Sequence, residues 1–328
     1  MRTTLTGFIL ALTLGCSTRA DAPRVELLSA DGGLKISGPF VHEHLALFVV
    51  ENPSAKSLGD FITLAEGLAS GQVKVSEKKS AQVNELMIEN GSDKPCFVQA
   101  GDVVKGGQQD RTLARDFVIP PKTPPTPVAS FCVEQSRWTG SAAFQSSTQN
   151  ADGRDLKCAI QGKRNQSEVW KQVAKSKSGL ADNNGLDAAK TSSLNEELDS
   201  SKIQERLKGF REALSKILEE RPQAVGLIAA VNGQFSTADI YADPGLFRKL
   251  FPRVLESATL EAISLKPEAK PAPDGTQAAA FLADSEKGTV KNEKIRDGLE
   301  SNTTDNEKSV RFDYRWNESS LHCQTLRK

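Results

Sequence analysis

The 328-residue chain has no net charge, because 42 basic residues balance 42 acidic ones. Proteins that bind nucleic acid or a charged membrane surface usually show an excess of positive charge. The balance argues against a nucleic-acid partner, so a ligand must be held by local chemistry. Hydrophobic residues make up 38% of the chain, which is enough for a globular core.

Long hydrophobic runs are also missing. The apolar run of residues 8–14, in MRTTLTGFILALTLGC, is too short to span a bilayer. It predicts a signal peptide over residues 1–15. Gly15-Cys16 is typical of a bacterial lipoprotein cleavage box, in which Cys16 becomes the lipidated first residue. Thr13 stands where Leu is more usual, so ordinary secretion remains an alternative. We expect an exported protein, either a membrane-anchored lipoprotein facing the periplasm or a secreted protein.

Cysteine is scarce. If Cys16 carries lipid, four cysteines remain, namely Cys96, Cys132, Cys158 and Cys323. An even number in an oxidising compartment permits up to two disulfides, in three connectivities. The alternative is four buried thiols that act as small hydrophobic groups. The sequence does not choose between them.

The familiar sequence motifs of catalytic and metal sites are absent. There is no GxSxG, no HExxH, no CxxC and no Walker motif, and we find no internal repeat. His42 and His44 flank Glu43 with ligand-like spacing, but the third histidine, His322, is far away in the sequence. A surface strand explains the pair adequately. We therefore predict neither a metal nor a cofactor.

Short apolar runs separated by turn residues predict a mainly antiparallel sheet over residues 24–135. The Asn232-Gly233 dipeptide predicts a hairpin, since it supplies the positive φ angles of a tight turn. Apolar residues at helical spacing predict helices that begin after Asp60, Asn165 and Asp243, and a further helix over residues 203–218. The expected fold is α+β, with a mainly antiparallel sheet core flanked by amphipathic helices, in one domain of residues 24–265.

Three segments of unusual composition are expected to lie outside this core. Residues 120–127, PPKTPPTP, predict an extended crossover loop because proline cannot donate to a β-ladder. Residues 175–201 are polar and predict a mobile surface segment. Residues 266–328 begin with a proline-rich connector and continue as a short C-terminal extension. This extension either packs back on the sheet or forms a small appendage.

The first polar cluster is GGQQDRT, which we call the QQDR loop (residues 106–112). Two glycines let successive backbone N–H groups point at one anion, and Arg111 offers a planar fork for phosphate or carboxylate. The side-chain amides of Gln108 and Gln109 could form hydrogen bonds with the polar edges of a ligand. The alternative is a polar hairpin in which Arg111 pairs with a nearby acid.

The second polar cluster is CVEQSRW, the CVEQ segment (residues 132–138). Cys132, Glu134 and Ser136 fall on one face at the end of a buried strand. Glu134 is the candidate catalytic residue, as a general base, while Trp138 could stack on an aromatic ring and Arg137 could bind phosphate. The alternative is an ion pair of Glu134 with Arg137 or Arg111 beneath a packed Trp138.

Several stretches of the chain resemble one protein family. They are FITLAEGLASGQVKVSE, LMIENGSDKPCFVQAGDVVKGGQQDRTL, the run that ends in CVEQSRW, and QSEVWKQV. Over about residues 40–262 the chain resembles the ARG and rhodanese-phosphatase-superfamily-associated protein domain family. This family of unknown function is named for its association with ADP-ribosylglycohydrolases and rhodanese-phosphatases. The resemblance implies a role near ADP-ribose or NAD-derived nucleotides.

The family's polar positions fall on residues of both clusters and on two residues before them. They are Glu77, Asn90, Gln108, Gln109, Arg111, Cys132, Glu134, Arg137 and Trp138. The chain departs from the family at Asp110, where Asn is expected, and at Ser136, where Gly is expected. An extra carboxylate beside a phosphate site weakens the binding of an anion.

The leading hypothesis is an exported, lipid-anchored domain that binds an anionic small molecule, such as an ADP-ribose-like nucleotide, between the two clusters. Arg111 and Arg137 would pair with the anion, Gln108 and Gln109 would bind polar edges, and Trp138 would stack. One alternative is a hydrolase of an ADP-ribose-like linkage that uses Glu134. Another is a structural lipoprotein of the cell envelope, in which both clusters are buried polar braces.

Overall fold

The protein is described by a computed structural model that covers residues 33–78, 84–134, 142–150, 153–186 and 198–328. The predicted signal peptide and Cys16 lie outside these residues, and so do Ser136, Arg137 and Trp138 of the CVEQ segment. Export and lipidation therefore stay predictions.

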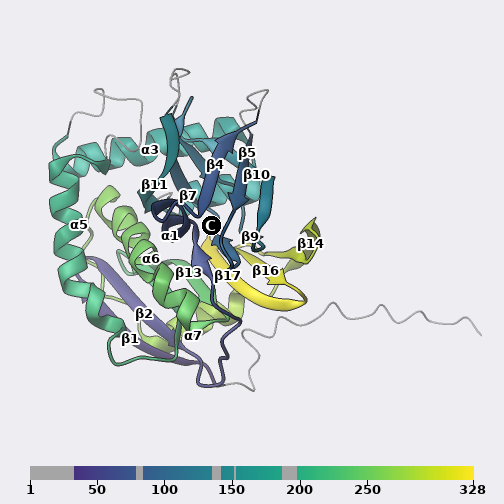
Figure 1. Ribbon diagram of the computed structural model, residues 1–328. Helices are drawn as coiled ribbons and strands as arrows, with labels where there is room; N and C mark the ends of the chain where they lie inside the picture. The colour runs from purple at the N-terminus through teal and green to yellow at the C-terminus, as the bar shows by residue number, and fades with distance from the viewer. Residues whose placement is uncertain (1–32, 79–83, 135–141, 151–152, 187–197) are drawn as a thin grey trace, which may run out of the picture.

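The largest element of the fold is an eight-stranded antiparallel sheet, seen in the lower half of Figure 1. Its spatial order is β1 (Lys35–His42), β2 (Leu45–Glu51), β12 (Ala224–Val231), β13 (Gln234–Tyr241), β17 (Ser319–Arg327), β16 (Ser309–Trp316), β15 (Leu299–Asp305) and β14 (Thr289–Arg296). The first and last parts of the described chain thus share one sheet.

Two smaller sheets lie above the large sheet in the view of Figure 1. The six-stranded sheet has the order β11 (Ala142–Asn150), β7 (Asp102–Gly107), β8 (Arg111–Leu113), β10 (Thr123–Cys132), β5 (Glu85–Asn90) and β4 (Val73–Glu77). The three-stranded sheet has the order β3 (Ile62–Thr63), β6 (Cys96–Val98) and β9 (Phe117–Ile119). Among the described residues, every strand pair is antiparallel except β3 with β6, so the prediction of an α+β fold with a mainly antiparallel core is confirmed.

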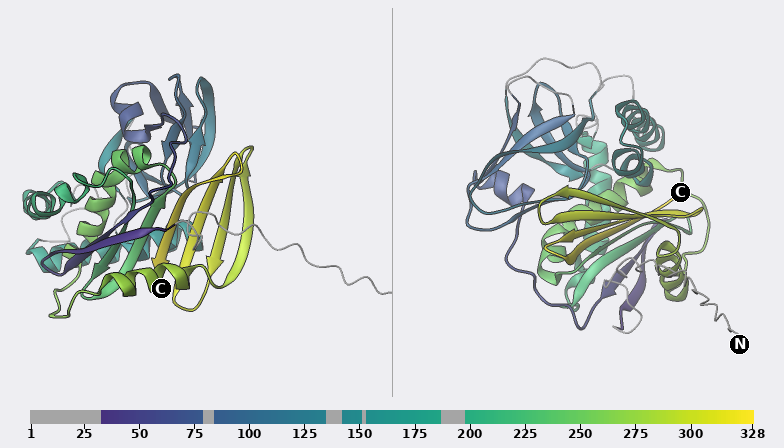
Figure 2. Two further views of the ribbon diagram at one scale, coloured as in Figure 1. Left: turned by 90° about the horizontal axis from the view of Figure 1, so that it is seen from below. Right: turned by 90° about the vertical axis from the view of Figure 1, so that its right-hand side faces the viewer.

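Helices pack on both faces of the large sheet and on the smaller sheets. They are α1 (Leu64–Ala69), α2 (Arg154–Lys157), the π-helix η2 (Cys158–Lys163), α3 (Gln166–Asn184), α5 (Ser201–Leu214), the 3-10 helix η4 (Ser215–Leu218), α6 (Pro244–Ser264) and α7 (Gly275–Ser285). Figure 2 shows α7 on the opposite face from α5 and α6.

Strand β2 shows why both faces need cover, because every one of its residues 45–50 is buried. Leu45, Leu47 and Val49 point into the core formed with α5 and α6, and the alternate residues point into the core formed with α7. A strand that is buried on both faces reads as a continuous apolar run, LALFVV, instead of an alternating one.

Local sequence signals placed several elements correctly. Asn232 and Gly233 have φ angles of 51° and 72°, as a tight turn between β12 and β13 requires. Asn165 caps α3, since its side-chain oxygen accepts the backbone N–H of Ser167 at 2.9 Å. The apolar stripe of residues 203–218 forms α5 and η4.

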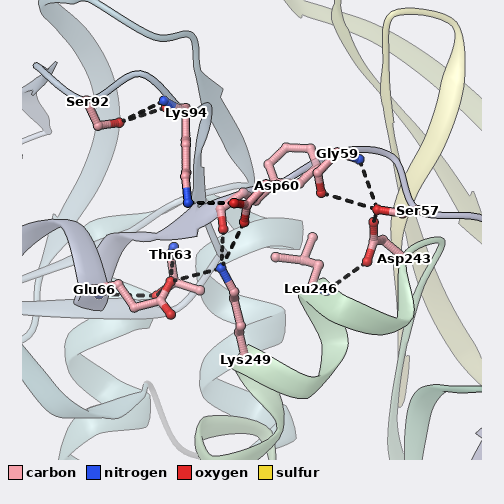
Figure 3. Close-up of polar contacts among 11 residues, drawn as sticks. Ser57, Gly59, Asp60, Thr63, Glu66, Ser92, Lys94, Asp243, Leu246 and Lys249 are labelled. Atoms are coloured by element: carbon pink, nitrogen blue, oxygen red, sulfur yellow. Dashed lines mark hydrogen bonds and ion pairs between the residues drawn. The ribbon is translucent and has the colours of Figure 1, made fainter. Parts of the chain in front are cut away.

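Asp243 caps α6 and also fixes the loop that follows β2 (Figure 3). Its carboxylate accepts hydrogen bonds from the backbone N–H of Leu246 at 2.9 Å and from the backbone N–H of Leu58 at 2.6 Å. Lys249, one turn further along α6, lies 3.4 Å from Asp60 and 3.8 Å from Glu66. The start of α6 is thereby tied to the chain that enters the smaller sheets.

The expectation that Asp60 begins the first helix is wrong. Thr63 is the N-cap of α1, and it forms a capping box with Glu66. Asp60 instead forms an ion pair with Lys94 at 2.5 Å. Ile62 and Thr63 form the short strand β3 before the helix, which delays the start of the helix.

The segments of unusual composition also differ from expectation. Most of PPKTPPTP belongs to β10, whose pairing with β5 shifts register between Thr123 and Thr126, where two prolines lie. Helix α3 continues to Asn184, into the segment expected to be mobile. The residues after 265 form α7 and four strands, and β17 pairs with β13. Of the two alternatives for the C-terminal part, the structure thus shows the one in which it packs back on the sheet.

The four cysteines of the described chain are all thiols. Cys96, Cys132 and Cys323 are buried, and Cys158 is half-buried. The structure thus matches the buried-thiol alternative, with no disulfide within the described residues. Burial raises the pKa of Cys132 and of Cys158 to about 11, so both are protonated at neutral pH.

Candidate functional site

The QQDR loop and the CVEQ segment meet because β8 and β10 are antiparallel neighbours. Cys132, the last residue of β10, lies directly opposite Arg111, the first residue of β8. The backbone N–H of Val133 continues this contact by donating to the carbonyl of Asp110 at 3.2 Å. The structure therefore brings the described part of the CVEQ segment, residues 132–134, against the QQDR loop.

Arg111 is the centre of this site, and only 1% of its surface is exposed. One guanidinium nitrogen, Nη1, donates to the backbone carbonyl of Gln109 at 3.1 Å, and Nη2 lies 3.9 Å from Oε1 of Glu77. The third nitrogen, Nε, is buried and has no hydrogen-bond partner among the described residues. A guanidinium with an unsatisfied donor is a costly group to bury.

Gln109 links the two clusters through its side chain. Its Nε2 donates to the backbone carbonyl of Glu134 at 3.1 Å, and its Oε1 accepts from the Cys132 thiol at 2.9 Å. Gln109 and Glu134 are 5% and 4% exposed, respectively. These contacts hold the end of β10 against the QQDR loop.

The glycine turn of the QQDR loop does not present an open anion cradle. Gly106 and Gly107 have φ angles of 125° and 57°, but two of the N–H groups of this turn are already satisfied. The N–H of Gly106 donates to Oδ1 of Asp110 at 3.0 Å, and the N–H of Gln108 donates to Oε1 of Glu77 at 2.9 Å. The chain's own carboxylates occupy the donors that the sequence suggested for a phosphate.

Glu77 and Gln108 form the more accessible side of the site. The Glu77 side chain is 20% exposed, and Gln108 is half-buried. The side-chain oxygen of Gln108 is nevertheless buried, with no hydrogen-bond partner in the described part of the chain. One donor on Arg111 and one acceptor on Gln108 are thus unsatisfied within a single loop.

Gln166 is a site residue that the sequence reasoning missed. Its side chain makes two hydrogen bonds to the backbone of Cys132, accepting the N–H at 2.9 Å and donating to the carbonyl at 2.8 Å. The signal was its position directly after the N-cap Asn165, which fixes the first turn of α3 against the end of β10. Asn90 is buried at another place, where it bonds the carbonyls of Lys94 and Ile119.

The histidine pair does not share a strand face. His42 ends β1, Glu43 has a φ angle of 50°, and His44 follows in the turn. His42 packs edge-on against Phe210, while Nε2 of His44 lies 2.8 Å from the carbonyl of Ala262. No three or more His, Cys, Asp or Glu side chains among the described residues are arranged to hold a metal ion.

A second buried polar cluster, the His322 cluster, lies on the face of the large sheet. Nδ1 of His322 is 2.6 Å from Oδ2 of Asp116, and Nε2 is 3.3 Å from Oδ1 of Asp239. All three side chains are at most 1% exposed, and the ring of His322 stacks on Tyr241 with 4.3 Å between centroids. Asp116 also accepts the backbone N–H of Ala100 at 2.8 Å. The cluster therefore joins loops of the smaller sheets to β13 and β17.

Charge interactions set the protonation of this cluster. Burial alone would lower the pKa of His322, but the carboxylates of Asp116 and Asp239 raise it to about 9. Burial alone would raise the pKa of Asp239, but its interactions with Lys157 and His322 lower this pKa below its usual value. An imidazolium between two carboxylates is therefore the expected state at neutral pH.

These features define an α+β protein with a large two-sided antiparallel sheet and a buried arginine where β8 meets β10. The sequence profile of the ARG and Rhodanese-Phosphatase-superfamily-associated Protein domain matches residues 33–325, and the chain belongs to this family of unknown function. The match includes α7 and the last four strands, and so extends beyond the resemblance over residues 40–262. No curated protein and no solved structure matches the chain. No helix among the described residues has the length and apolar character needed to cross a bilayer.

Proposed function

We propose that this protein is an exported domain that binds an anionic small molecule where the QQDR loop meets the CVEQ segment. The observation that supports the proposal is the buried guanidinium of Arg111, whose Nε lacks a hydrogen-bond partner among the described residues. A buried donor left unsatisfied costs about 1–3 kcal/mol, and a ligand acceptor at this position would recover that free energy.

The charges near Arg111 limit which kinds of anion could bind there. The carboxylate of Glu77 lies 3.9 Å from Arg111, and the carboxylates of Glu77 and Asp110 occupy two backbone donors of the loop. A compact, highly charged anion would be repelled by them. A phosphate diester or carboxylate that also carries hydroxyl groups fits better, because a hydroxyl could donate to the unsatisfied oxygen of Gln108. ADP-ribose-like molecules have this combination of groups.

The substitution Arg111→Lys tests the proposal, since it keeps the positive charge and removes Nε and the planar fork. We expect the affinity of the mature chain for ADP-ribose to fall at least about tenfold, measured by isothermal titration, with NAD and inorganic phosphate as comparison ligands. Arg311→Lys is the matched control. Arg311 is also 1% exposed, but its guanidinium is paired with Asp313 on β16. It should leave the affinity unchanged.

The results of these measurements distinguish the binding hypothesis from the hydrolase and structural-brace hypotheses. If none of the three ligands binds the wild-type chain, or if both arginine variants weaken binding equally, the proposed site is wrong. Turnover of the ligand that disappears in Glu134→Gln, with affinity kept, would favour the hydrolase hypothesis instead. A fall in melting temperature for Arg111→Lys with no ligand bound by the wild type would favour the structural-brace hypothesis.

Export and membrane anchoring form the second part of the proposal, and they rest on the N-terminal sequence alone. In a bacterial host, the wild-type chain is expected to incorporate radiolabelled palmitate, whereas Cys16→Ala is not, because Cys16 would be the lipidated residue. Cys158→Ala is the control and should keep the label. An exported chain that begins near residue 16 without lipid would instead establish ordinary secretion. A cytoplasmic chain with an intact N-terminus would contradict both forms of export.

A further inference from the structure

A cavity of about 660 Å³ lies between α7 and the end of the large sheet, away from the QQDR loop. It is lined by Phe235 of β13, by Gln277 and Phe281 of α7, by the turn between β15 and β16, and by Arg327 and Lys328 at the end of β17. Pockets for small molecules usually measure about 300–1,000 Å³. This cavity therefore has the size of a ligand site.

One wall of the cavity is aromatic. The rings of Phe235 and Phe281 are stacked, with 5.1 Å between their centroids and 8° between their planes. Both side chains are only half-buried. The ring of Phe235 also packs against the ring of Phe48, with 5.8 Å between the two ring centroids. Because the two rings are stacked and both line the cavity, an outer face of the pair offers a flat, rigid surface on which another planar ring could stack.

The rest of the lining is mainly positive. Four cations, Lys287, Lys308, Arg327 and Lys328, line the cavity with two carboxylates, Asp284 and Glu307. Lys328 also forms an ion pair with Asp305 at the edge of the cavity. Nη1 of Arg327 donates to the neutral amide of Gln234 at 3.2 Å, so this bond holds the guanidinium without cancelling its charge. Lys308 lies 3.9 Å from Asp284. With Asp305 counted, four cations meet three carboxylates, and in a chain with no net charge this excess of positive charge favours an anion.

We propose that this cavity binds a small molecule that has a planar ring and an anionic group. The ring stacks on the Phe235–Phe281 pair, and the anionic group pairs with Arg327 and the neighbouring lysines. The combination matters, because neither an isolated ring nor an isolated anion engages both parts of the wall. The inference is independent of the proposed function, since the two sites share no residue.

Binding to the full mature chain, measured by equilibrium dialysis, separates these contributions. AMP carries a ring and a phosphate, indole-3-acetate carries a ring and a carboxylate, adenosine supplies the ring alone, and inorganic phosphate supplies the anion alone. We expect AMP or indole-3-acetate to bind at least about tenfold more tightly than adenosine and inorganic phosphate, since stacking and charge pairing each contribute. Which of the two binds better shows whether phosphate or carboxylate is preferred.

Two single substitutions test whether the ligand binds in this cavity. Phe281→Leu keeps an apolar side chain but removes the ring, and Arg327→Gln removes the charge of a partly exposed residue. Each should weaken binding of the ring-bearing anion about tenfold. The matched control is a half-buried ring beside an arginine in another part of the protein, Phe40 with Arg221 at 4.8 Å, changed to Phe40→Leu and Arg221→Gln. These controls should not affect binding.

Two results would overturn the inference. One is that neither ring-bearing anion binds more tightly than inorganic phosphate. The other is that binding survives both Phe281→Leu and Arg327→Gln. Binding lost in Arg111→Lys but kept in these variants would place the ligand at the QQDR loop, so failure here is distinguishable from failure of the proposed function.

Discussion

Replacing Asp116 with Ala is expected to lower the free energy of unfolding by about 3–5 kcal/mol, the cost typical of removing one partner from a buried ion pair. Asp116 is fully buried, and its two oxygens bind His322 and the backbone N–H of Ala100. Its loss leaves a buried imidazolium with one carboxylate neighbour and a buried N–H with no acceptor. The measurement is urea unfolding of the mature chain at neutral pH.

The control for Asp116→Ala is Asp297→Ala. Asp297 also forms an ion pair, with Lys294 at 2.8 Å, but its side chain is fully exposed. The urea midpoint of this variant should stay close to that of the wild type, because water and salt screen an exposed pair. Equal losses of stability in the two variants would show that the His322 cluster does not hold the sheets together.

The second large effect is a loss of stability between pH 6.5 and pH 9. The pKa of His322 is raised from 6.5 to about 9 in the folded protein, so the folded state binds this proton more tightly than the unfolded state does. The contribution is fully present below pH 6.5 and is lost as the pH rises through about 9. The difference corresponds to about 3 kcal/mol. Urea unfolding measured at a series of pH values should show this decline.

Two further measurements separate His322 from other titrating groups. His322→Gln should remove most of the decline between pH 6.5 and pH 9, even though it lowers stability at pH 6. NMR of the imidazole ring in the wild-type protein should give a midpoint near pH 9, whether or not the variant folds well. A midpoint below 6.5 would mean that desolvation outweighs the two carboxylates, and stability would then rise with pH.

The parts of the fold that could be predicted from the sequence are those set by residues that lie close together along the chain. Asn165, Asn232-Gly233 and Asp243 each act within about four positions along the chain, so their caps and turns are visible in the sequence. The prolines of β10 were misread because a register shift at their own position accommodates them within the strand. Asp60 was misread because the next residues form a strand with the distant Cys96.

The polar sites also include contacts that the sequence suggested and contacts that depend on residues far apart along the chain. The meeting of the two clusters was expected, and the pairing of Arg111 with Cys132 provides it. The occupation of the glycine turn by Glu77 was not expected, because it depends on a side chain 31 positions away. The His322 cluster was missed altogether, since Asp116 and His322 are 206 positions apart and no local pattern connects them.

The place of β17 in the large sheet has a consequence for how the protein is made. This strand is synthesised after the other seven strands of the sheet, yet it lies between β13 and β16. Until it arrives, β13 has an open edge whose backbone groups can pair with another chain. The sheet therefore cannot close as the chain emerges, and the interval before β17 joins is the period in which the growing chain is most exposed to aggregation.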